Sequence, residues 1–321
     1  MQVSFIIPLF NNLALTRACV DSLQATLPSG LTHEIILVDD GSTDDTRTWL
    51  STLTPPFRVV LNDRNLGYAA ANNRAIALAR GEFLALLNND LVLLPHWLEP
   101  MFGAHRSLAD HAGFIGNIQL DARTGVVDHT GIVINHQGKP VHDRALPPLR
   151  TRLLSKVRPV PAITGACVLV ERNLWQRLGG FDEGYVNGGE DVDLCFRARA
   201  VGRTNAVALN SVVRHHISAS VGRKLRDEQN SCRLARRWRR EFLADESAAV
   251  SWCRAHFEKI LLEPHYADRA LAASTFCYLH GLRATPPAEA IAGLETALAA
   301  EFARWETMFP PPAPAAPPRG V

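Results

Sequence analysis

The sequence predicts an α/β protein with a mostly parallel sheet covered by helices on both faces, followed by an α-helical extension. Strand-like apolar runs alternate with amphipathic helices through the first 90 residues, an order that is typical of parallel sheets. Beyond about residue 222, helix follows helix without a convincing strand. The chain has 321 residues, and its 47% hydrophobic and 21% charged residues are ordinary for a globular protein with a substantial core.

The first half of the chain contains four predicted strands with helices between them. The strands are expected at residues 3–9, 34–38, 57–61 and 83–95. Asn11-Asn12 offers cap chemistry for the first helix, and Ser42 with Asp45 fits a capping box for the second. The third helix is rich in alanine and ends at Gly81.

The second half alternates less regularly. A helix is predicted through Leu108, and later helices end at Gly179 and Gly202. Further strands are expected at 113–118, 126–134, 162–170 and 204–209. Residues 136–159 lack periodicity, which favours a long functional loop or a poorly ordered connector. Helices over 223–308 and a Pro/Ala-rich tail at 309–321 complete the prediction.

Absent patterns argue against several classes of protein. No G-x-G-x-x-G follows the first strand and no G-x-x-x-x-G-K-[ST] occurs, which disfavours dinucleotide and P-loop binding. No apolar stretch is long enough to span a membrane and no signal-peptide pattern follows Met1, so we expect a cytoplasmic protein. The six cysteines lack zinc-type spacing and are expected to be reduced core or surface residues.

The fourth strand is interrupted by Asn88-Asn89-Asp90, which we expect at the carboxyl end of a buried strand. Open α/β sheets bind ligands at that edge. Asp90 offers a hard carboxylate oxygen, which suits Mg²⁺ or Mn²⁺ shared with substrate phosphates. Taken alone, the three residues fit a turn or a helix N-cap at least as well.

Similar polar clusters follow the other strands, and together they resemble the family 2 inverting glycosyltransferases of GT-A fold, in a rhamnosyltransferase-like branch. The segments that carry the resemblance are IIPLFNN, ILVDDGSTDDT, NLGYAAANN, LLNND, TGACVLVERNLWQRLGGFDEGY, GGEDVDLCFRARAVG and HHISAS. It implies a GT-A domain over 1–222, with a nucleotide-sugar half at 1–92 and an acceptor half at 93–222.

The resemblance implies that the base, ribose and diphosphate of a nucleotide sugar contact the segments after the first strands. The matching residues are Pro8, Phe10, Asn11, Asp39, Asp40, Asn65, Gly67, Asn72, Asn88 and Asn89. A carboxylate among them would accept the imide N–H of a base or a ribose hydroxyl. The family's D-x-D motif is reduced here to Asn-Asn-Asp, which leaves Asp90 as the principal ligand of Mn²⁺ or Mg²⁺. His215 completes the coordination, with His216 or a purely structural histidine as the alternative.

Glu190 and Asp191 resemble the family's catalytic acidic pair, with Asp191 as the general base at the acceptor hydroxyl. Glu190 and Asp193 share one helical face, so either binds the acceptor or only complements the helix N-terminus. Acceptor contacts are implied for Gly165, Ala166, Trp175 and Asp193. For Trp175, a place in the core is the alternative.

The implied function is metal-dependent, inverting transfer of a hexosyl or deoxyhexosyl group from a UDP- or dTDP-sugar, in polysaccharide biosynthesis. The acceptor would be a hydroxyl of a glycan, a lipid-linked or a protein-linked molecule. The alternatives are a catalytically weak, glycosyltransferase-like binding module and a sugar-nucleotide pyrophosphorylase, which is disfavoured because its Gly-rich basic loop is missing.

The basic segment 223–240 admits two interpretations. With Leu234, Trp238 and Phe242 interleaved, it fits an amphipathic helix in peripheral contact with anionic lipid at the inner face of the membrane. It fits a solvated or self-associating surface, and hence a homo-oligomer, slightly better. No recognised module supports nucleic-acid binding.

Overall fold

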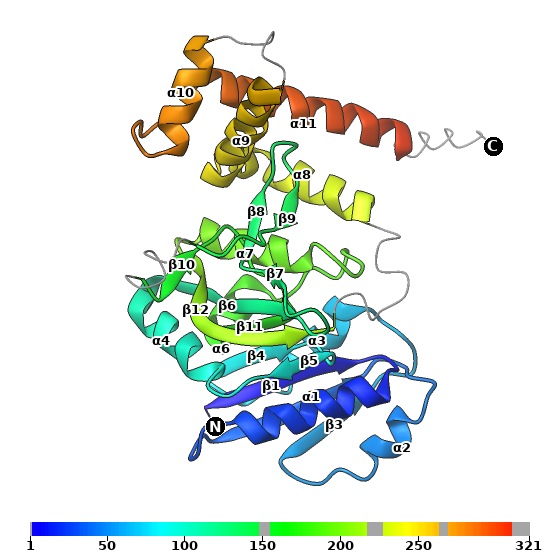
Figure 1. The fold of residues 1–321 in the computed structure, drawn as a ribbon. Coiled ribbons are helices and arrows are strands. Elements are labelled where there is room, and N and C mark those ends of the chain that lie inside the picture. The colour runs from blue at the N-terminus through cyan, green and yellow to red at the C-terminus, as the bar shows by residue number, and fades with distance from the viewer. Residues whose placement is uncertain (1, 148–154, 217–226, 263–268, 310–321) are drawn as a thin grey trace, which may run out of the picture. The chain divides into compact units, whose positions relative to one another are not determined.

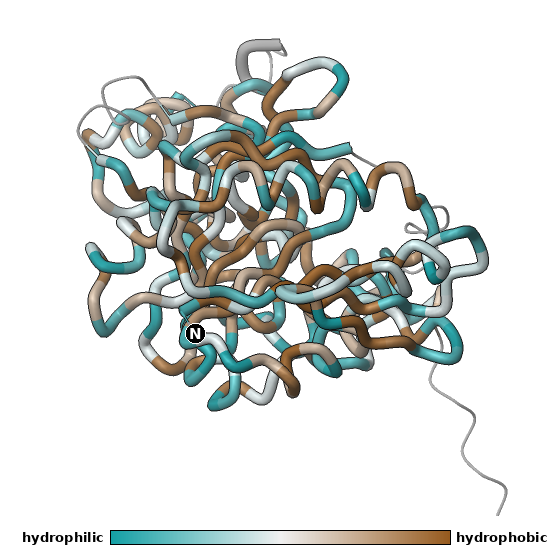
Figure 2. Tube along the Cα trace, turned by 90° about the horizontal axis from the view of Figure 1, so that it is seen from below, coloured by the Kyte–Doolittle hydropathy of each residue, from teal (hydrophilic) through white to brown (hydrophobic). Residues whose placement is uncertain are grey.

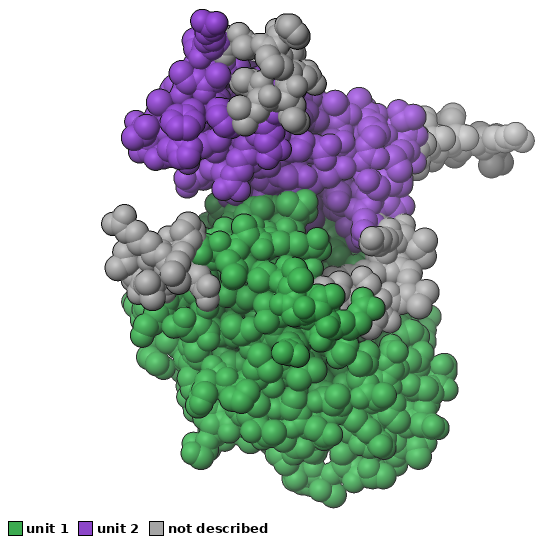
Figure 3. All heavy atoms as spheres, viewed as in Figure 1, with its two compact units in different colours: residues 1–133, 140–226 green, residues 134–139, 227–321 purple. Residues whose placement is uncertain are grey.

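The computed structural model describes residues 2–147, 155–216, 227–262 and 269–309, which belong to two compact units. The first unit comprises residues 1–133 and 140–226, and the second comprises 134–139 and 227–321 (Figure 3). The predicted domain boundary after residue 222 lies outside the described residues, as do residues 310–321 of the predicted tail.

The first unit is built on one large sheet (Figure 1). The strands of this sheet are β1 (Val3–Leu9), β2 (His33–Asp39), β3 (Phe57–Leu61), β4 (Phe83–Leu87), β5 (Leu91–Leu93), β6 (Ala112–Asp121), β7 (Val127–His129), β10 (Val157–Pro159), β11 (Cys167–Glu171) and β12 (Thr204–His215). The helices of the unit are α1 (Leu13–Thr26), α2 (Thr46–Leu50), α3 (Tyr68–Ile76), α4 (Leu98–Leu108), the short 3₁₀ helix η1 (Ala109–His111), α6 (Arg172–Leu178) and α7 (Glu190–Ala200). A separate two-stranded sheet consists of β8 (Ile132–Ile134) and β9 (Pro140–His142).

The sheet has a parallel part with antiparallel additions. The strands lie in the order β10-β12-β6-β11-β4-β1-β2-β3. The group β3-β2-β1-β4 is parallel throughout, as is the pair of β6 and β12. Strand β11 runs antiparallel to β4 between these two groups. This arrangement confirms the predicted α/β class and places the carboxyl ends of β1, β2 and β4 at one edge.

The main hydrophobic core lies on one face of this sheet. Val3, Phe5 and Ile7 of β1 are fully buried there, because successive side chains of a strand point to opposite faces. Leu23 of α1 and Met101 of α4 join the same cluster. Each such side chain contributes about 1.5–3 kcal/mol by its burial. Helix α3 contacts β1 and β2, and its buried residues lie outside this cluster, which places it on the other face. Figure 2 shows hydrophobic segments in the interior and hydrophilic ones in peripheral loops.

The predicted fourth strand, 83–95, is two strands instead of one. Strand β4 ends at Leu87, the chain turns through Asn88-Asn89-Asp90, and β5 then pairs antiparallel with β12. Strand β12 itself is longer than predicted, because its second half continues as the partner of β5. The predicted turn at Asn88-Asn89-Asp90 is therefore real, and it lies at the end of a buried strand as expected.

The predicted capping box of Ser42 and Asp45 is wrong. Helix α2 begins only at Thr46, and the Ser42 hydroxyl oxygen accepts the backbone N–H of Asn11 instead. The stretch 136–159 also differs from the expected loop, since it contains β9 and β10, while its residues 148–154 lie outside the described ones.

The second unit is helical, as the sequence predicts. Its helices are α8 (Asp227–Leu243), α9 (Glu246–Leu262), α10 (Arg269–Leu279) and α11 (Ala288–Met308). The turn 134–139 between β8 and β9 belongs to this unit, where Lys139 Nζ lies 2.9 Å from Glu301 and 5.5 Å from the ring centroid of Trp305. Within the described ranges, none of the helices combines the length and apolar character that crossing a membrane requires.

Candidate active site

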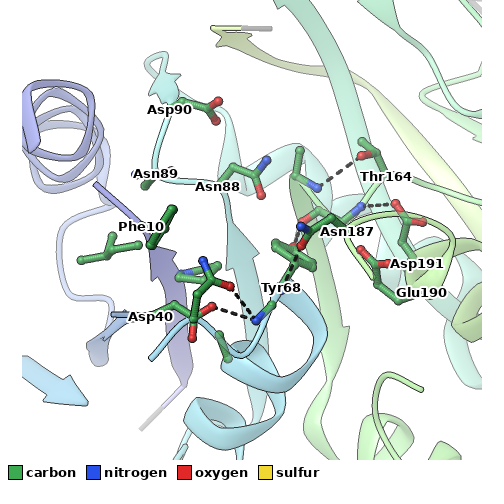
Figure 4. A pocket seen from close by; sticks show the side chains of 17 residues that line it. Phe10, Asp40, Tyr68, Asn88, Asn89, Asp90, Thr164, Asn187, Glu190 and Asp191 are labelled. Carbon is green, nitrogen blue, oxygen red and sulfur yellow. Dashed lines mark hydrogen bonds between the residues drawn. The ribbon is translucent and has the colours of Figure 1, made fainter. Parts of the chain in front are cut away.

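A pocket lies at the carboxyl ends of β1, β2 and β4, where the sequence predicts ligand binding (Figure 4). Most of the predicted site residues line it, and these are Pro8, Phe10, Asp40, Asn65, Gly67, Asn88, Asn89, Asp90, Gly165, Ala166, Glu190 and Asp191. The predicted residues that the structure does not bring to its lining are Asn11, Asp39, Asn72, Trp175, Asp193 and His215. Five residues without a predicted role of their own also line it, namely Leu9, Tyr68, Ala71, Thr164 and Asn187, and all of them except Asn187 lie within the segments that carry the resemblance.

The acidic pair after β2 divides into two different environments. Asp39 is fully buried, and its oxygens accept the backbone N–H of Ser42 and the guanidinium of Arg47, at 3.1 and 2.6 Å. Asp40 lines the pocket, where it accepts the backbone N–H groups of Leu66 and Gly67 at 2.9 Å each. The two acids therefore differ in role, because Asp39 supports the turn while Asp40 faces the ligand space.

Asn11 and Asn72 are engaged within the protein. Asn11 Oδ1 accepts the backbone N–H of Thr43 at 2.8 Å and so joins the turn after β1 to the turn after β2. Asn72 is fully buried in α3, and its amide nitrogen donates to the carbonyl of Tyr68 at 2.8 Å. Both residues support the walls of the pocket from behind.

Asp90 and His215 are brought together by the pairing of β5 with β12. The register places Leu91 opposite His215, so the residue before β5 lies beside the end of β12. Asp90 Oδ1 lies 3.1 Å from His215 Nε2, but without hydrogen-bond geometry, so among the described residues this buried oxygen has no hydrogen-bond donor. A buried carboxylate oxygen without a donor, facing an imidazole nitrogen, fits a divalent cation.

The charge of the pocket gives a second reason for a cation. Four carboxylates line it, those of Asp40, Asp90, Glu190 and Asp191, and the described lining includes no lysine or arginine. A diphosphate would be repelled by this lining without a positive ion. In the described part of the chain, no group of three or more His, Cys, Asp and Glu side chains could hold a metal ion. A cation at Asp90 and His215 would therefore be shared with a ligand, which is the usual arrangement for Mg²⁺ and Mn²⁺.

Asp191 stands at the start of α7 with both carboxylate oxygens engaged. Its Oδ2 accepts the backbone N–H of Gly165 at 2.9 Å, and its Oδ1 accepts the backbone N–H of Val192 at 2.8 Å. Glu190 is buried beside it and accepts the N–H of Gly188 at 2.8 Å. In the view of Figure 4, this acidic pair lies on the side of the pocket opposite to Phe10 and Asp90.

Trp175 and Asp193 lie in the core behind the pocket. The ring of Trp175 is 4% exposed and packs edge-on against Phe181, with 4.8 Å between the centroids. Asp193 is fully buried and pairs with Arg197 at 2.8 Å, which also donates to the carbonyl of Gly180 at 2.7 Å. Trp175 thus lies in the core, which is the alternative given for it, and Asp193 pairs with Arg197, so the structure brings neither side chain to the pocket.

The cysteines nearest the pocket are protonated. Burial raises the pKa of Cys167 to about 12, and burial likewise raises the pKa values of the Cys19 and Cys195 thiols, to which Asp90 and Asp191 respectively add a repulsive charge. A thiolate nucleophile at these positions is excluded at neutral pH. This agrees with the expectation of reduced core cysteines.

Tyr68 and Asn187 are the most informative of the residues that sequence reasoning missed. Tyr68 lies within the segment NLGYAAANN, directly after Gly67, and Asn187 directly precedes the segment that begins at Gly188. An aromatic hydroxyl directly after a predicted loop glycine was the available signal for Tyr68. Asn187 has a left-handed backbone, with φ +54°, which the sequence does not reveal.

Sequence comparison with known proteins points to one protein family. Residues 4–179, more than half of the chain, match the sequence profile of glycosyl transferase family 2. An uncharacterized protein, y4gI of Sinorhizobium fredii, is 32% identical over 285 residues, which cover 82% of this chain and 30% of that protein. The O-antigen biosynthesis protein RfbC of Myxococcus xanthus is 34% identical over 229 residues, 68% of this chain and 18% of that protein. The chain thus spans less than a third of the length of these two relatives.

A third relative is matched over about two thirds of its length. The N-acetylglucosaminyl-diphospho-decaprenol L-rhamnosyltransferase of Mycobacterium tuberculosis is 30% identical over 210 residues, which cover 59% of this chain and 68% of the enzyme.

Two solved structures share the fold. The crystal structure of GalNAc-T7 with UDP, GalNAc and Mn²⁺ has a TM-score of 0.61 at 17% identity, covering 87% of this chain and 55% of that one. The structure of S. aureus TarS 1–349 in complex with UDP-GlcNAc has a TM-score of 0.56 at 16% identity, covering 96% and 91%. These likenesses concern the fold alone, and they confirm the predicted GT-A fold.

Proposed function

The chain belongs to glycosyl transferase family 2, and from that premise we propose that it transfers a sugar from a nucleoside-diphosphate sugar to an acceptor hydroxyl, with inversion at the anomeric carbon and with Mn²⁺ or Mg²⁺ as cofactor. One observation carries the proposal. The pocket holds Asp90, whose buried oxygen has no hydrogen-bond donor among the described residues, on one side and the fixed carboxylate of Asp191 on the other. This arrangement suits a displacement reaction, with Asp90 on the side of the leaving diphosphate and Asp191 on the side of the attacking hydroxyl.

In the proposed reaction, Asp191 acts at the acceptor, and Asp90 and His215 act at the leaving diphosphate. Asp191 removes the proton from the acceptor hydroxyl, whose oxygen then attacks the anomeric carbon from the face opposite the diphosphate. The bond between the anomeric carbon and the diphosphate oxygen breaks as the new glycosidic bond forms. Asp90 and His215 would hold the cation, which when bound neutralises the charge of the departing nucleoside diphosphate.

The donor side of the pocket suits a nucleoside. Phe10 is 46% exposed beside Pro8 and offers an apolar surface to a base. Asp40 Oδ2 accepts one hydrogen bond within the protein, from Gly67, and retains a lone pair for an imide N–H or a ribose hydroxyl. These groups support a UDP- or dTDP-sugar carrying a hexosyl or deoxyhexosyl group. The solved relatives with UDP and UDP-GlcNAc are consistent with this donor class.

The acceptor belongs to the same proposal. The relatives named as an O-antigen biosynthesis protein and a decaprenol-diphosphate rhamnosyltransferase support a glycan or lipid-linked acceptor in polysaccharide biosynthesis. Thr164, Gly165 and Ala166 form the wall next to Asp191, and their small side chains leave room for a sugar beside the base.

The test is a panel of UDP-, dTDP- and GDP-sugars with Mn²⁺ or Mg²⁺, in which donor hydrolysis and transfer are measured. We expect metal-dependent turnover of at least one UDP- or dTDP-sugar, and its loss in EDTA and in Asp90→Ala. Asp110→Ala serves as the matched control, because Asp110 is an exposed carboxylate outside the pocket. Full activity of the wild type in EDTA would refute the metal-dependent mechanism. Metal-dependent nucleotide binding without turnover of any donor would indicate a binding module instead.

A further inference from the structure

The hydroxyl of Tyr68 connects the donor side of the pocket with the proposed base. Tyr68 is the first residue of α3, and its hydroxyl donates to the carbonyl of Gly165 at 2.8 Å. The backbone N–H of the same Gly165 donates to Asp191 Oδ2 at 2.9 Å. Two peptide groups flank the Gly165 Cα. The Tyr68 hydroxyl holds the one that contains the Gly165 carbonyl, and Asp191 holds the one that contains the Gly165 N–H (Figure 4).

Tyr68 is itself fixed from the nucleotide side. The preceding N–H groups, of Leu66 and Gly67, both donate to Asp40, which we place at the nucleoside. The ring of Tyr68 packs at 5.7 Å from that of Phe181, which restricts its rotation. A continuous set of contacts thus runs from Asp40 through the start of α3 to Gly165 and Asp191.

The Tyr68 hydroxyl packs closely against the backbone of Gly165. A Cβ atom built on Gly165 would lie 2.9 Å from the Tyr68 hydroxyl oxygen, which is closer than carbon and oxygen approach in folded proteins. A side chain at position 165 would therefore displace the hydroxyl from its present position. The glycine predicted to admit a sugar therefore also admits the tyrosine.

The hydrogen bond also limits what Tyr68 can do chemically. Its single proton is donated to the Gly165 carbonyl, so the hydroxyl has no proton to give to a leaving group in this arrangement. Tyr68 therefore acts through Gly165 and Asp191 and not on the reacting atoms.

We propose that Tyr68 is a positioning residue that sets the direction of the Asp191 carboxylate through Gly165 and ties it to the nucleotide-binding side. The inference rests on the proposed function, in which Asp191 is the general base. Displacement of a base by about 1 Å can lower a rate by about 100-fold, so a single hydroxyl is sufficient to matter.

The test uses Tyr68→Phe in the full chain, because phenylalanine keeps the ring contact with Phe181 and removes only the hydroxyl. We expect kcat for transfer to fall about 10-fold or more, while the donor KM and the calorimetric Kd of the nucleoside diphosphate with Mn²⁺ stay within about 2-fold. Tyr278→Phe, in α10 of the second unit, is the matched control and should leave kcat, KM and Kd unchanged.

Two further variants separate positioning from a structural role. In an Asp191→Asn background, Tyr68→Phe should have no additional effect on residual transfer, because its partner in catalysis is already lost. Gly165→Ala should lower kcat by displacing the hydroxyl, and it should lower kcat less in the Tyr68→Phe background, where the oxygen is absent.

If the wild type is active and Tyr68→Phe leaves kcat unchanged, the inference is overturned and the proposed function stands. The same conclusion follows if Tyr68→Phe changes only KM, or if it lowers kcat equally in the wild-type and Asp191→Asn backgrounds. A wild type inactive with every donor overturns the proposed function, and the inference with it.

Discussion

The Asp191 carboxylate is held in one direction before any acceptor binds. Its oxygens accept the N–H groups of Gly165 and Val192, and it stands in the first turn of α7. Preorganised groups of this kind need no rearrangement at the moment of reaction.

Asp191→Asn should lower transfer by about 100- to 10,000-fold, since an amide cannot accept the acceptor's proton. The Kd for nucleoside diphosphate with Mn²⁺, measured by calorimetry, should stay unchanged, because Asp191 lies on the acceptor side. Asp110→Asn is the control for loss of an exposed carboxylate. Unchanged turnover in Asp191→Asn would remove its role as base.

Glu34, at the start of β2, shows how a buried carboxylate stabilises the sheet. It is 3% exposed and accepts hydrogen bonds from Ser4 at 2.6 Å, from the Arg80 backbone N–H at 2.7 Å and from Arg58 at 2.8 Å. Burial alone would raise its pKa, but the hydrogen bonds from Ser4, Arg58 and Arg80 outweigh burial and hold the pKa of Glu34 below its usual 4.5.

A lowered pKa in the folded state means that this stabilisation is complete above about pH 4.5 and is lost as the pH falls through the folded pKa. We expect Glu34→Gln to lower the free energy of unfolding by about 1.5–3 kcal/mol at pH 7. Denaturant titrations should show the difference between wild type and variant shrinking below pH 4.5. A difference that is constant from pH 7 to pH 3 would contradict this account.

At the scale of elements, strand pairing decides which residues meet. The order of strands and helices in the first half and the turn at Asn88-Asn89-Asp90 follow from local sequence, because period and turn chemistry are local properties. Most of the pocket lining is implied by the resemblance to the family and not by local sequence. The pairing of β5 with β12 does not follow from local sequence, since Leu91 and His215 are far apart in the chain. Nor does the sequence distinguish Asp39 from Asp40, because only the turn geometry directs one inward to Arg47 and the other to the pocket.

Helix α8 does not present the apolar face that the predicted amphipathic contact with a membrane requires. Its apolar residues Leu234, Trp238 and Phe242 are 2%, 8% and 1% exposed, so they are unavailable for insertion into a lipid surface. Exposed basic residues remain on the helix, and they are Arg233, Arg236, Arg237, Arg239 and Arg240. The predicted residues Arg223, Lys224, Leu225 and Arg226 lie outside the described residues.

The membrane contact that α8 can make is therefore electrostatic. We expect the protein to bind anionic vesicles at low ionic strength and to be released at about 0.15 M salt, where the screening length falls to about 8 Å. Vesicle sedimentation should show the same loss for Arg236→Glu/Arg240→Glu. Salt-resistant binding would point to insertion of apolar groups, and no binding at low salt would favour a solvated or self-associating surface.

At the scale of the whole molecule, the pocket and the C-terminal helices belong to different compact units. The turn 134–139 belongs to the second unit, within which Lys139 lies 2.9 Å from Glu301 and 3.9 Å from Glu228. Every residue lining the pocket belongs to the first unit. Ligand binding should accordingly stabilise the first unit directly.

Thermal unfolding tests this expectation together with the cation. UDP or dTDP at about 100 times its Kd, with Mn²⁺ present, should stabilise the pocket-bearing unit by about 2.7 kcal/mol. The nucleotide without Mn²⁺ should give little shift, because the carboxylate lining repels the diphosphate. Asp90→Ala should abolish the Mn²⁺-dependent part. An equal shift in EDTA would show that the diphosphate is bound without a cation.

The contact between Tyr68 and Gly165 also bears on how enzymes of this architecture are recombined. The two residues belong to the halves predicted to bind donor and acceptor. With the proposed role of Tyr68, we expect that a chimaera joined after residue 92 has to retain both the hydroxyl at 68 and the bare backbone at 165 to keep the base correctly directed. Acceptor preference in such hybrids should therefore be transplanted as a matched pair of segments, one from each side of the junction.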